Sequence, residues 1–184
     1  QKSITDVMQT LAMAGGSFEV AVTPAEAPSS VGIDHCEFLV AGHAGVPRRS
    51  LSKVASGGEL ARISLAIAVT DTMTATVDTL IFDEIDTGIS GETANRVAKK
   101  MAVISKDHQV IAITHLPQIA AMADSHYFIR KQTDQKNTQT MIRKLNESES
   151  LKEISRMISG DQWSETSMEH AKEMKSLADE TKLY

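Results

Sequence analysis

The chain has 184 residues, of which 41% are hydrophobic and 23% are charged, and its formal net charge is −5 at pH 7. These values are typical of a globular domain with a sizeable core, and they argue against a uniformly basic surface for nucleic acid. No run is apolar enough to cross a membrane, and no signal peptide is visible.

Residues 1–14 predict a helix, because apolar residues recur at helical spacing before two glycines end the pattern. Such a short run does not establish a coiled coil by itself, so an ordinary surface helix is the alternative. The chain begins at Gln1 rather than at Met, from which we expect a fragment or a processed chain.

Two short strands follow, over residues 18–23 and 36–41, separated by a predicted loop at 24–34 that contains two prolines and a glycine. Together they predict a small antiparallel piece beside a main sheet. The single cysteine, Cys36, falls in the second strand, where we expect a buried structural thiol. Because one cysteine allows no internal disulfide, a reducing compartment is favoured.

The next feature is Ser56-Gly57-Gly58-Glu59, which runs directly into an apolar helix predicted over residues 57–73. Glycines at a helix start let a ligand approach the backbone N–H groups, and the helix dipole favours an anion there. Taken alone, an ordinary capped helix is the preferred interpretation. Arg62 interrupts the apolar helix; a surface or salt-bridged arginine and a nucleotide-sensing one are weighed equally, and Arg62 is not counted as a site residue.

An apolar strand at 78–82 ends in Asp83 and Glu84. Its unbroken apolar run predicts burial on both faces, as in a parallel sheet, whose ligands gather at the carboxyl ends of the strands. Asp83 is suited to hold Mg²⁺, and Glu84 is suited to polarise a water for attack on a γ-phosphate. Without neighbouring motifs, two solvated carboxylates would be the better interpretation.

A turn at 86–91 leads into a helix at 92–105, and a second buried strand at 108–114 ends in His115. A histidine beside a phosphate site can hydrogen-bond the γ-phosphate and respond to its loss, although a lone histidine is more often structural. The remaining residues predict a short helix after Leu116, strands at 125–131 and 138–145, and helices at 149–158 and 164–182. The other histidines show no metal-ligand spacing.

In this order, the three motifs resemble the C-terminal half of an ATPase head of the ABC type, in its SMC-like class. Ser56–Glu59 matches the ABC signature motif, Leu80–Glu84 the Walker B strand, and His115 the switch histidine. The resemblance implies an α/β fold, with a mostly parallel sheet flanked by helices and a small antiparallel β piece. Within that class, the bacterial ATPases of DNA double-strand-break repair are the closer match, through residues 38–42, 54–62, 82–91 and 114–118.

The resemblance also implies a role for each motif residue. Glu84 and His115 would be catalytic, Asp83 would hold Mg²⁺, and Asp86 would belong to the D-loop that contacts a second head. The γ-phosphate of an ATP held by that second head would be bound by Ser56, Gly57, Gly58 and Glu59. Residues 1–16 would be the end of a coiled-coil arm, and residues 17–184 would form the half-head.

No Gly-rich phosphate loop ending in Lys-Ser or Lys-Thr occurs in the chain. The resemblance places that loop in an N-terminal half-head of the same protein, so we expect this chain to be inactive alone. The expected partners are that half-head, a second head in an ATP-dependent homodimer, and DNA, in the cytoplasm and nucleoid of a bacterium and without a membrane. Two alternatives remain open: a non-catalytic head-association module, and a half of another ABC-class ATPase, such as another SMC-like protein or a transporter subunit.

Overall fold

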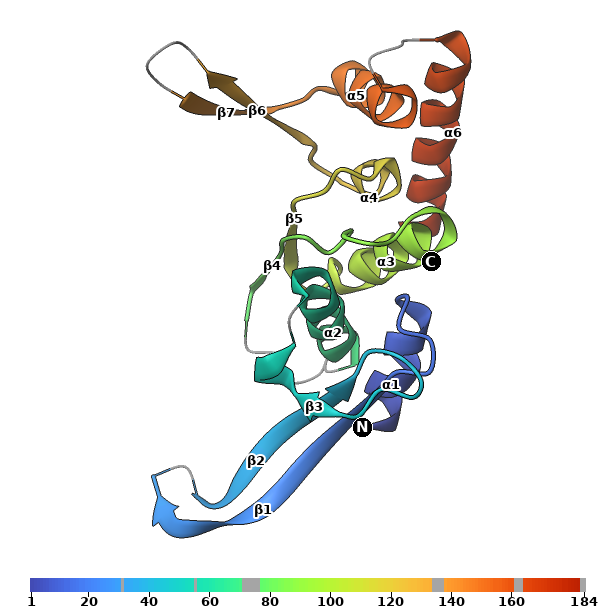
Figure 1. Ribbon diagram of the computed structural model, residues 1–184. Helices are drawn as coiled ribbons and strands as arrows, with labels where there is room; N and C mark the ends of the chain where they lie inside the picture. Colours follow the sequence, from blue (N-terminus) through green and yellow to red (C-terminus); the bar gives the residue numbers. More distant parts are fainter. Residues whose placement is uncertain (31, 55, 71–76, 134–137, 161–163, 183–184) are drawn as a thin grey trace. The chain divides into compact units, whose positions relative to one another are not determined.

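The computed structural model describes residues 1–30, 32–54, 56–70, 77–133, 138–160 and 164–182 (Figure 1). The chain divides into two compact units, Gln1–Thr114 and His115–Tyr184, and each is described by itself. No helix in these ranges is long and apolar enough to cross a membrane.

The first unit begins with helix α1 (Lys2–Thr10), which contacts α2 and β1. Met8, Leu11 and Met13 are fully buried, so this segment contributes to the core of its unit. The helix ends earlier than predicted, and the chain then turns through Ala12, whose φ is 64°, and Gly15. That α1 continues a coiled-coil arm stays a prediction.

Strands β1 (Ser17–Ser29), β2 (Gly32–Ala41) and β3 (Arg49–Ser50) form an antiparallel sheet in the order β1-β2-β3. The predicted loop at 24–34 was wrong, since pairing continues through Pro24 with Asp34 and resumes at the turn. Prolines are tolerated there because β1 is an edge strand and needs no donor on its open side. The prediction of a buried Cys36 was also wrong: the thiol is exposed, on the part of this long ribbon where both strands are mostly exposed (Figure 1).

The remainder of the first unit contains α2 (Gly57–Thr70), β4 (Thr79–Phe82), α3 (Gly91–Ile104) and β5 (Gln109–Ala112). Strands β4 and β5 are parallel, so α3 is the crossover of a βαβ unit, as the predicted order of elements requires. Helix α3 buries one apolar stripe and contacts α2. The predicted end of the α2 helix, at residue 73, lies outside the described residues.

One face of the β4–β5 pair is open, which contradicts the prediction of burial on both faces. Ile81 is 67% exposed, and its register partner Ile111 is 43% exposed. Ile113, two residues beyond Ile111, is also exposed. In the described residues this sheet has two strands, and these three isoleucines remain largely exposed to solvent.

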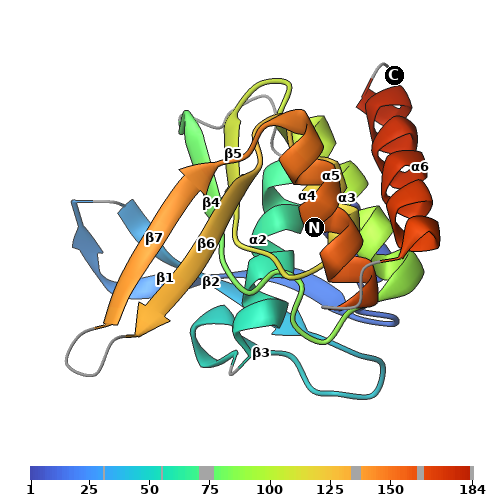
Figure 2. The same ribbon diagram turned by 90° about the horizontal axis from the view of Figure 1, so that it is seen from above.

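The second unit contains α4 (Pro117–Ala121), β6 (Tyr127–Thr133), β7 (Thr138–Lys144), α5 (Glu147–Ser159) and α6 (Glu165–Lys182). The elements lie close to their predicted positions, and β6 pairs with β7 as an antiparallel hairpin. The predicted loop at 132–137 was wrong at its start, because Gln132 and Thr133 belong to β6; residues 134–137 lie outside the described residues. Helices α4, α5 and α6 enclose a small aliphatic core (Figure 2). Helix α5 begins in a capping box, in which Asn146 and Glu149 each accept a hydrogen bond from the other's backbone N–H.

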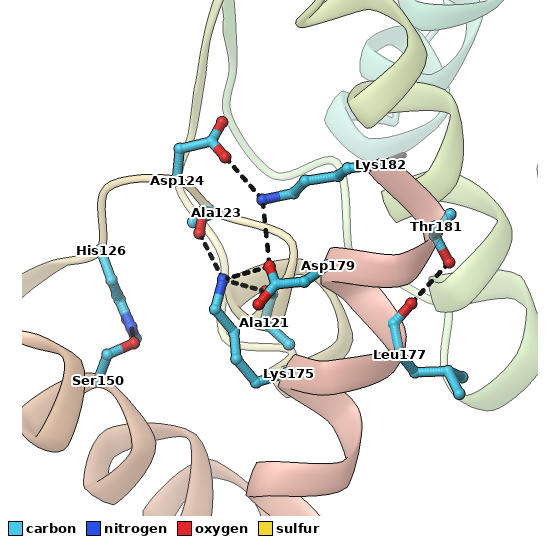
Figure 3. A network of polar contacts seen from close by, with 10 residues as sticks. All are labelled: Ala121, Ala123, Asp124, His126, Ser150, Lys175, Leu177, Asp179, Thr181 and Lys182. Carbon is cyan, nitrogen blue, oxygen red and sulfur yellow. Dashed lines mark hydrogen bonds and ion pairs between the residues drawn. The ribbon is translucent and has the colours of Figure 1, made fainter. Parts of the chain in front are cut away.

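Polar contacts tie α6 to the end of α4 (Figure 3). The Lys175 ammonium donates to the carbonyl oxygens of Ala121, at 3.2 Å, and Ala123, at 3.1 Å. It also pairs with Asp179, while Lys182 pairs with Asp124 at 2.7 Å. A cation at a helix C-terminus satisfies carbonyls that lack a partner within the helix, so these contacts fix the packing of the second unit.

Candidate functional site

In the first unit, the start of α2 lies against the turn that follows β4. A Cβ atom built on Gly57 would overlap Oε2 of Glu84, and one built on Gly58 would lie 3.0 Å from the Cβ and carbonyl oxygen of Thr87. A side chain at Gly57 would displace the Glu84 carboxylate, and one at Gly58 would press against Thr87. The structure therefore brings the predicted signature motif and the predicted catalytic glutamate together.

The helix start has the cap that its sequence predicted. Ser56 accepts the N–H of Glu59 through its hydroxyl oxygen at 3.4 Å and the N–H of Leu60 through its carbonyl at 3.0 Å. The Glu59 carboxylate is directed elsewhere, toward His43 at 3.8 Å. The backbone of the first turn, with the positive end of the helix dipole, is therefore presented beside Glu84.

The side chains of Asp83 and Glu84 are exposed, whereas the next residue, Ile85, is fully buried and anchors the turn. Glu84 has a φ of 57°, in the left-handed region that non-glycine residues rarely adopt. Among the described residues, no three His, Cys, Asp or Glu side chains converge as a metal site. One exposed carboxylate fits Mg²⁺, which keeps several waters and takes its other ligands from substrate phosphates.

Asp86 is buried within the unit, at 3% exposure, and accepts a hydrogen bond from the hydroxyl of Thr114 at 2.6 Å. This bond connects the turn after β4 to the residues that follow β5. The carboxylate of Asp86 is therefore buried and not presented at the surface. A contact between the predicted D-loop and a second head stays a prediction.

Arg62 is a functional candidate that sequence reasoning left out. It is only 6% exposed, and its Nη1 donates to the carbonyl oxygens of Thr87, at 2.8 Å, and Ile85, at 3.4 Å. Burial lowers the pKa of Arg62, while the nearby Glu59 carboxylate opposes that effect. The interpretation as a surface arginine is wrong, and the described residues show no salt bridge to Arg62. The available signal in the sequence was one charge in an otherwise apolar helix.

His115 is the first residue of the second unit, and its side chain is exposed. The predicted role of this histidine beside a γ-phosphate stays a prediction. A hollow of about 480 Å³ in the second unit is lined by Ile158, Ser164, Thr166, Ser167, Glu169, His170 and Glu173. It contains none of the predicted site residues, and we do not assign it to the site.

Comparison with known proteins finds the DNA repair protein RecN of several bacteria, although no family model matches. The chain is 46% identical to RecN of Bacillus subtilis over 151 residues, which are 82% of this chain and 26% of that protein. It is 42% identical to RecN of Halalkalibacterium halodurans over 181 residues, or 96% of this chain and 32% of that protein. The predicted resemblance to bacterial DNA repair proteins is confirmed, and the chain spans about a third or less of these relatives.

Among solved structures, the chain resembles the Smc head domain with a coiled coil and joint from Pyrococcus yayanosii, with a TM-score of 0.56 and 24% identity over 84% of this chain and 28% of that one. A second Smc head, from Pyrococcus furiosus and bound to the C-terminal domain of ScpA, gives a TM-score of 0.54 at 24% identity over 85% of this chain and 37% of that one. These similarities confirm the predicted fold class, the α/β fold of an SMC-type ATPase head.

Proposed function

We propose that this chain is the C-terminal half of an SMC-like ATPase head that acts in DNA repair. Most of this chain matches part of the DNA repair protein RecN. The contact between Gly57 and Glu84 is the observation that carries this proposal. It unites an anion-binding helix start with a carboxylate that can act as a general base. Phosphate chemistry requires both kinds of group, and this chain supplies them to two different ATP molecules.

The start of α2 binds the γ-phosphate of an ATP that a second head holds. Ser56 donates its hydroxyl to a phosphate oxygen, and the backbone N–H groups at Gly57 and Gly58 add partial positive charge. Glu59 is the last residue of this four-residue motif. This arrangement acts electrostatically, because hydrogen-bond donors that are already in place stabilise the negative charge that develops on the phosphate oxygens.

At the other side of the contact, Asp83 holds Mg²⁺ and Glu84 accepts a proton from the attacking water. When bound, Mg²⁺ supplies neutralisation of the phosphate charge. Both carboxylates are exposed, so an ATP molecule held by another half-head can reach them. His115 hydrogen-bonds the γ-phosphate of the same ATP and responds to its loss.

The ATP served by Asp83 and Glu84 is held by an N-terminal half-head of the same protein. The open face of β4 and β5 supports this partner, because Ile81 on β4, Ile111 on β5 and Ile113 just beyond β5 are exposed. Uncovered apolar groups on a parallel pair are unusual in a finished domain. We assign this face to the sheet of the N-terminal half-head.

The second head is contacted through the turn after β4. Because the Asp86 carboxylate is buried, the exposed Thr87 and Gly88 supply the surface of that contact, and Asp86 shapes the turn from within. ATP bound between two heads joins them, and loss of the γ-phosphate removes contacts from both sides at once. DNA is the proposed partner of the whole protein, as its similarity to RecN suggests.

The test is ATP hydrolysis by this chain mixed with a separately expressed N-terminal half, compared with each half alone. We expect turnover only in the mixture, and loss of that turnover with Glu84→Gln. Glu92→Gln is the matched control, because Glu92 is an exposed carboxylate on α3 whose recorded partner is Arg96. ATP hydrolysis by this chain alone would refute the proposal that it carries only half of an ATP site. If the halves associate in the presence of ATP but do not hydrolyse it, the non-catalytic association module is favoured.

A further inference from the structure

The Arg62 guanidinium connects the two halves of the site. From the second turn of α2, it reaches the carbonyl oxygens of Ile85 and Thr87, which lie on either side of Asp86 in the turn after β4. We propose that Arg62 is a positioning residue for hydrolysis, which holds this turn against the start of α2. When Ser56–Glu59 contacts the ATP of the second head, this connection orients Glu84 toward the ATP of the N-terminal half-head. This inference rests on the proposed function.

The burial of Arg62 argues against a purely stabilising role. In the described ranges Arg62 has no ion pair, and its buried Nε has no hydrogen-bond partner. Taking a guanidinium out of water is costly, and an apolar side chain of similar length would fill the same space without that cost. What the arginine adds is a directed pair of hydrogen bonds to one turn, and hence a defined geometry.

The packing around Arg62 leaves little room for independent movement. A Cβ on Gly58 would lie 3.1 Å from Nη1 of Arg62 and 3.0 Å from Thr87, so helix start, guanidinium and turn are in close contact. Glu84 belongs to the same turn, since its carbonyl accepts the N–H of Thr87 at 3.0 Å. A displacement of the helix start would therefore move Thr87 and, with it, the backbone that orients Glu84.

Removal of this connection should separate catalysis from binding. Ser56, Asp83 and the backbone of the α2 start remain in Arg62→Met, so ATP still binds. Orientation of Glu84 is lost, and a misplacement of about 1 Å reduces turnover by roughly 100-fold. We therefore expect kcat to fall about 10- to 100-fold while KM for ATP changes less than about threefold.

The experiment measures kcat, KM and the thermal unfolding midpoint of the full-length protein with Arg62→Met, Arg62→Lys and Leu65→Ala. Lys keeps one charged donor, so Arg62→Lys should have a kcat between those of Arg62→Met and the unmodified protein. If Arg62→Met does not fold, the kcat of Arg62→Lys tests the inference. Leu65→Ala is the stability control, because Leu65 is fully buried on the same helix. We expect it to lower the unfolding midpoint with little effect on kcat.

Two results would overturn the inference. The first is that both Arg62 variants have the same kcat as the unmodified protein. The second is that the Arg62 variants lower kcat no more than Leu65→Ala does when their unfolding midpoints fall by the same amount. The proposed function has its own readout in Glu84→Gln. If Glu84→Gln abolishes turnover and the Arg62 variants do not reduce it, only the coupling is wrong; if Glu84→Gln hydrolyses ATP normally, the proposed function fails.

Discussion

The Thr114 hydroxyl donates to the Asp86 carboxylate at 2.6 Å, which joins the residue just beyond β5 to the turn just beyond β4. Adjacent parallel strands share a ladder of backbone hydrogen bonds, but their loops need contacts of their own to keep a fixed separation. This bond provides one, because Asp86 is almost fully buried. It fixes the backbone between Asp83, the proposed magnesium ligand, and the start of α3.

Replacing Thr114 with Val should therefore destabilise the first unit. Val keeps the shape of the side chain and removes the donor, which leaves a buried carboxylate with one hydrogen bond fewer. We expect a loss of about 1–3 kcal/mol in the free energy of unfolding, measured by urea denaturation. Thr114→Ser keeps the hydroxyl and should lose clearly less; equal losses in the two variants would show that the bond contributes nothing.

A side chain at Gly57 should interfere directly with Glu84. In Gly57→Ala the new Cβ would overlap Oε2 of Glu84, so the carboxylate must move. We expect turnover by the assembled head to fall about 10- to 100-fold, since the general base is displaced. Gly42→Ala is the control, because a Cβ there meets Glu59 only at an ordinary contact distance of 3.5 Å.

Turnover and the unfolding midpoint are both measured for these two glycine variants. Alanine is a better helix former than glycine, so Gly57→Ala should not lower the unfolding midpoint through α2 itself. Normal turnover in Gly57→Ala would mean that Glu84 works from a position away from the start of α2.

Much of this architecture followed from patterns of apolar residues. The βαβ unit and the positions of Asp83 and Glu84 were predictable, because a short apolar run between helical patterns indicates a parallel strand. The anion-binding interpretation of Ser56–Glu59 depended on the other motifs. Burial was harder to predict: the apolar run around Ile81 indicated a strand enclosed on both faces, but the side chain of Ile81 is 67% exposed.

The errors have separate physical causes. Pro24 indicates a loop by composition, yet a proline on an edge strand breaks no ladder bond, and the edge position is a property of the fold. Cys36 was judged by its residue type, which is usually buried, although its part of the ribbon extends beyond the core. Arg62 was noticed as the one charge in an apolar helix but was not counted as a site residue, because its acceptors are backbone carbonyls and the sequence does not show which backbone groups a side chain meets.

In the second unit, Lys175→Met should weaken the attachment of α6 to α4. Methionine has a similar length and no donor, so the carbonyl oxygens of Ala121 and Ala123 lose a charged partner. We expect a loss of about 1–3 kcal/mol in the free energy of unfolding. Lys172→Met is the control, since Lys172 is exposed on the same helix; a similar loss in that variant would refute the assignment.

His126 should make the stability of the second unit depend on pH. Its Nδ1 lies 2.9 Å from the hydroxyl of Ser150. Burial lowers the pKa of His126 below its ordinary value of 6.5, Glu153 opposes that shift, and the Lys175 ammonium adds to it. The unfolded chain therefore takes up a proton on His126 more readily than the folded chain does.

The sign of the effect follows from this difference. Above the ordinary pKa of 6.5, His126 is neutral in both states and its contribution to stability is complete. As the pH falls below that value toward the lowered pKa of the folded state, the unfolded state binds more protons and the free energy of unfolding decreases. The measurement is urea denaturation between about pH 7.5 and about pH 5, with His126→Gln as the variant that should lose this part of the slope. His170→Gln, at an exposed position on α6, should keep the slope of the unmodified protein. If His126→Gln follows the same pH curve as the unmodified protein, His126 does not carry the dependence.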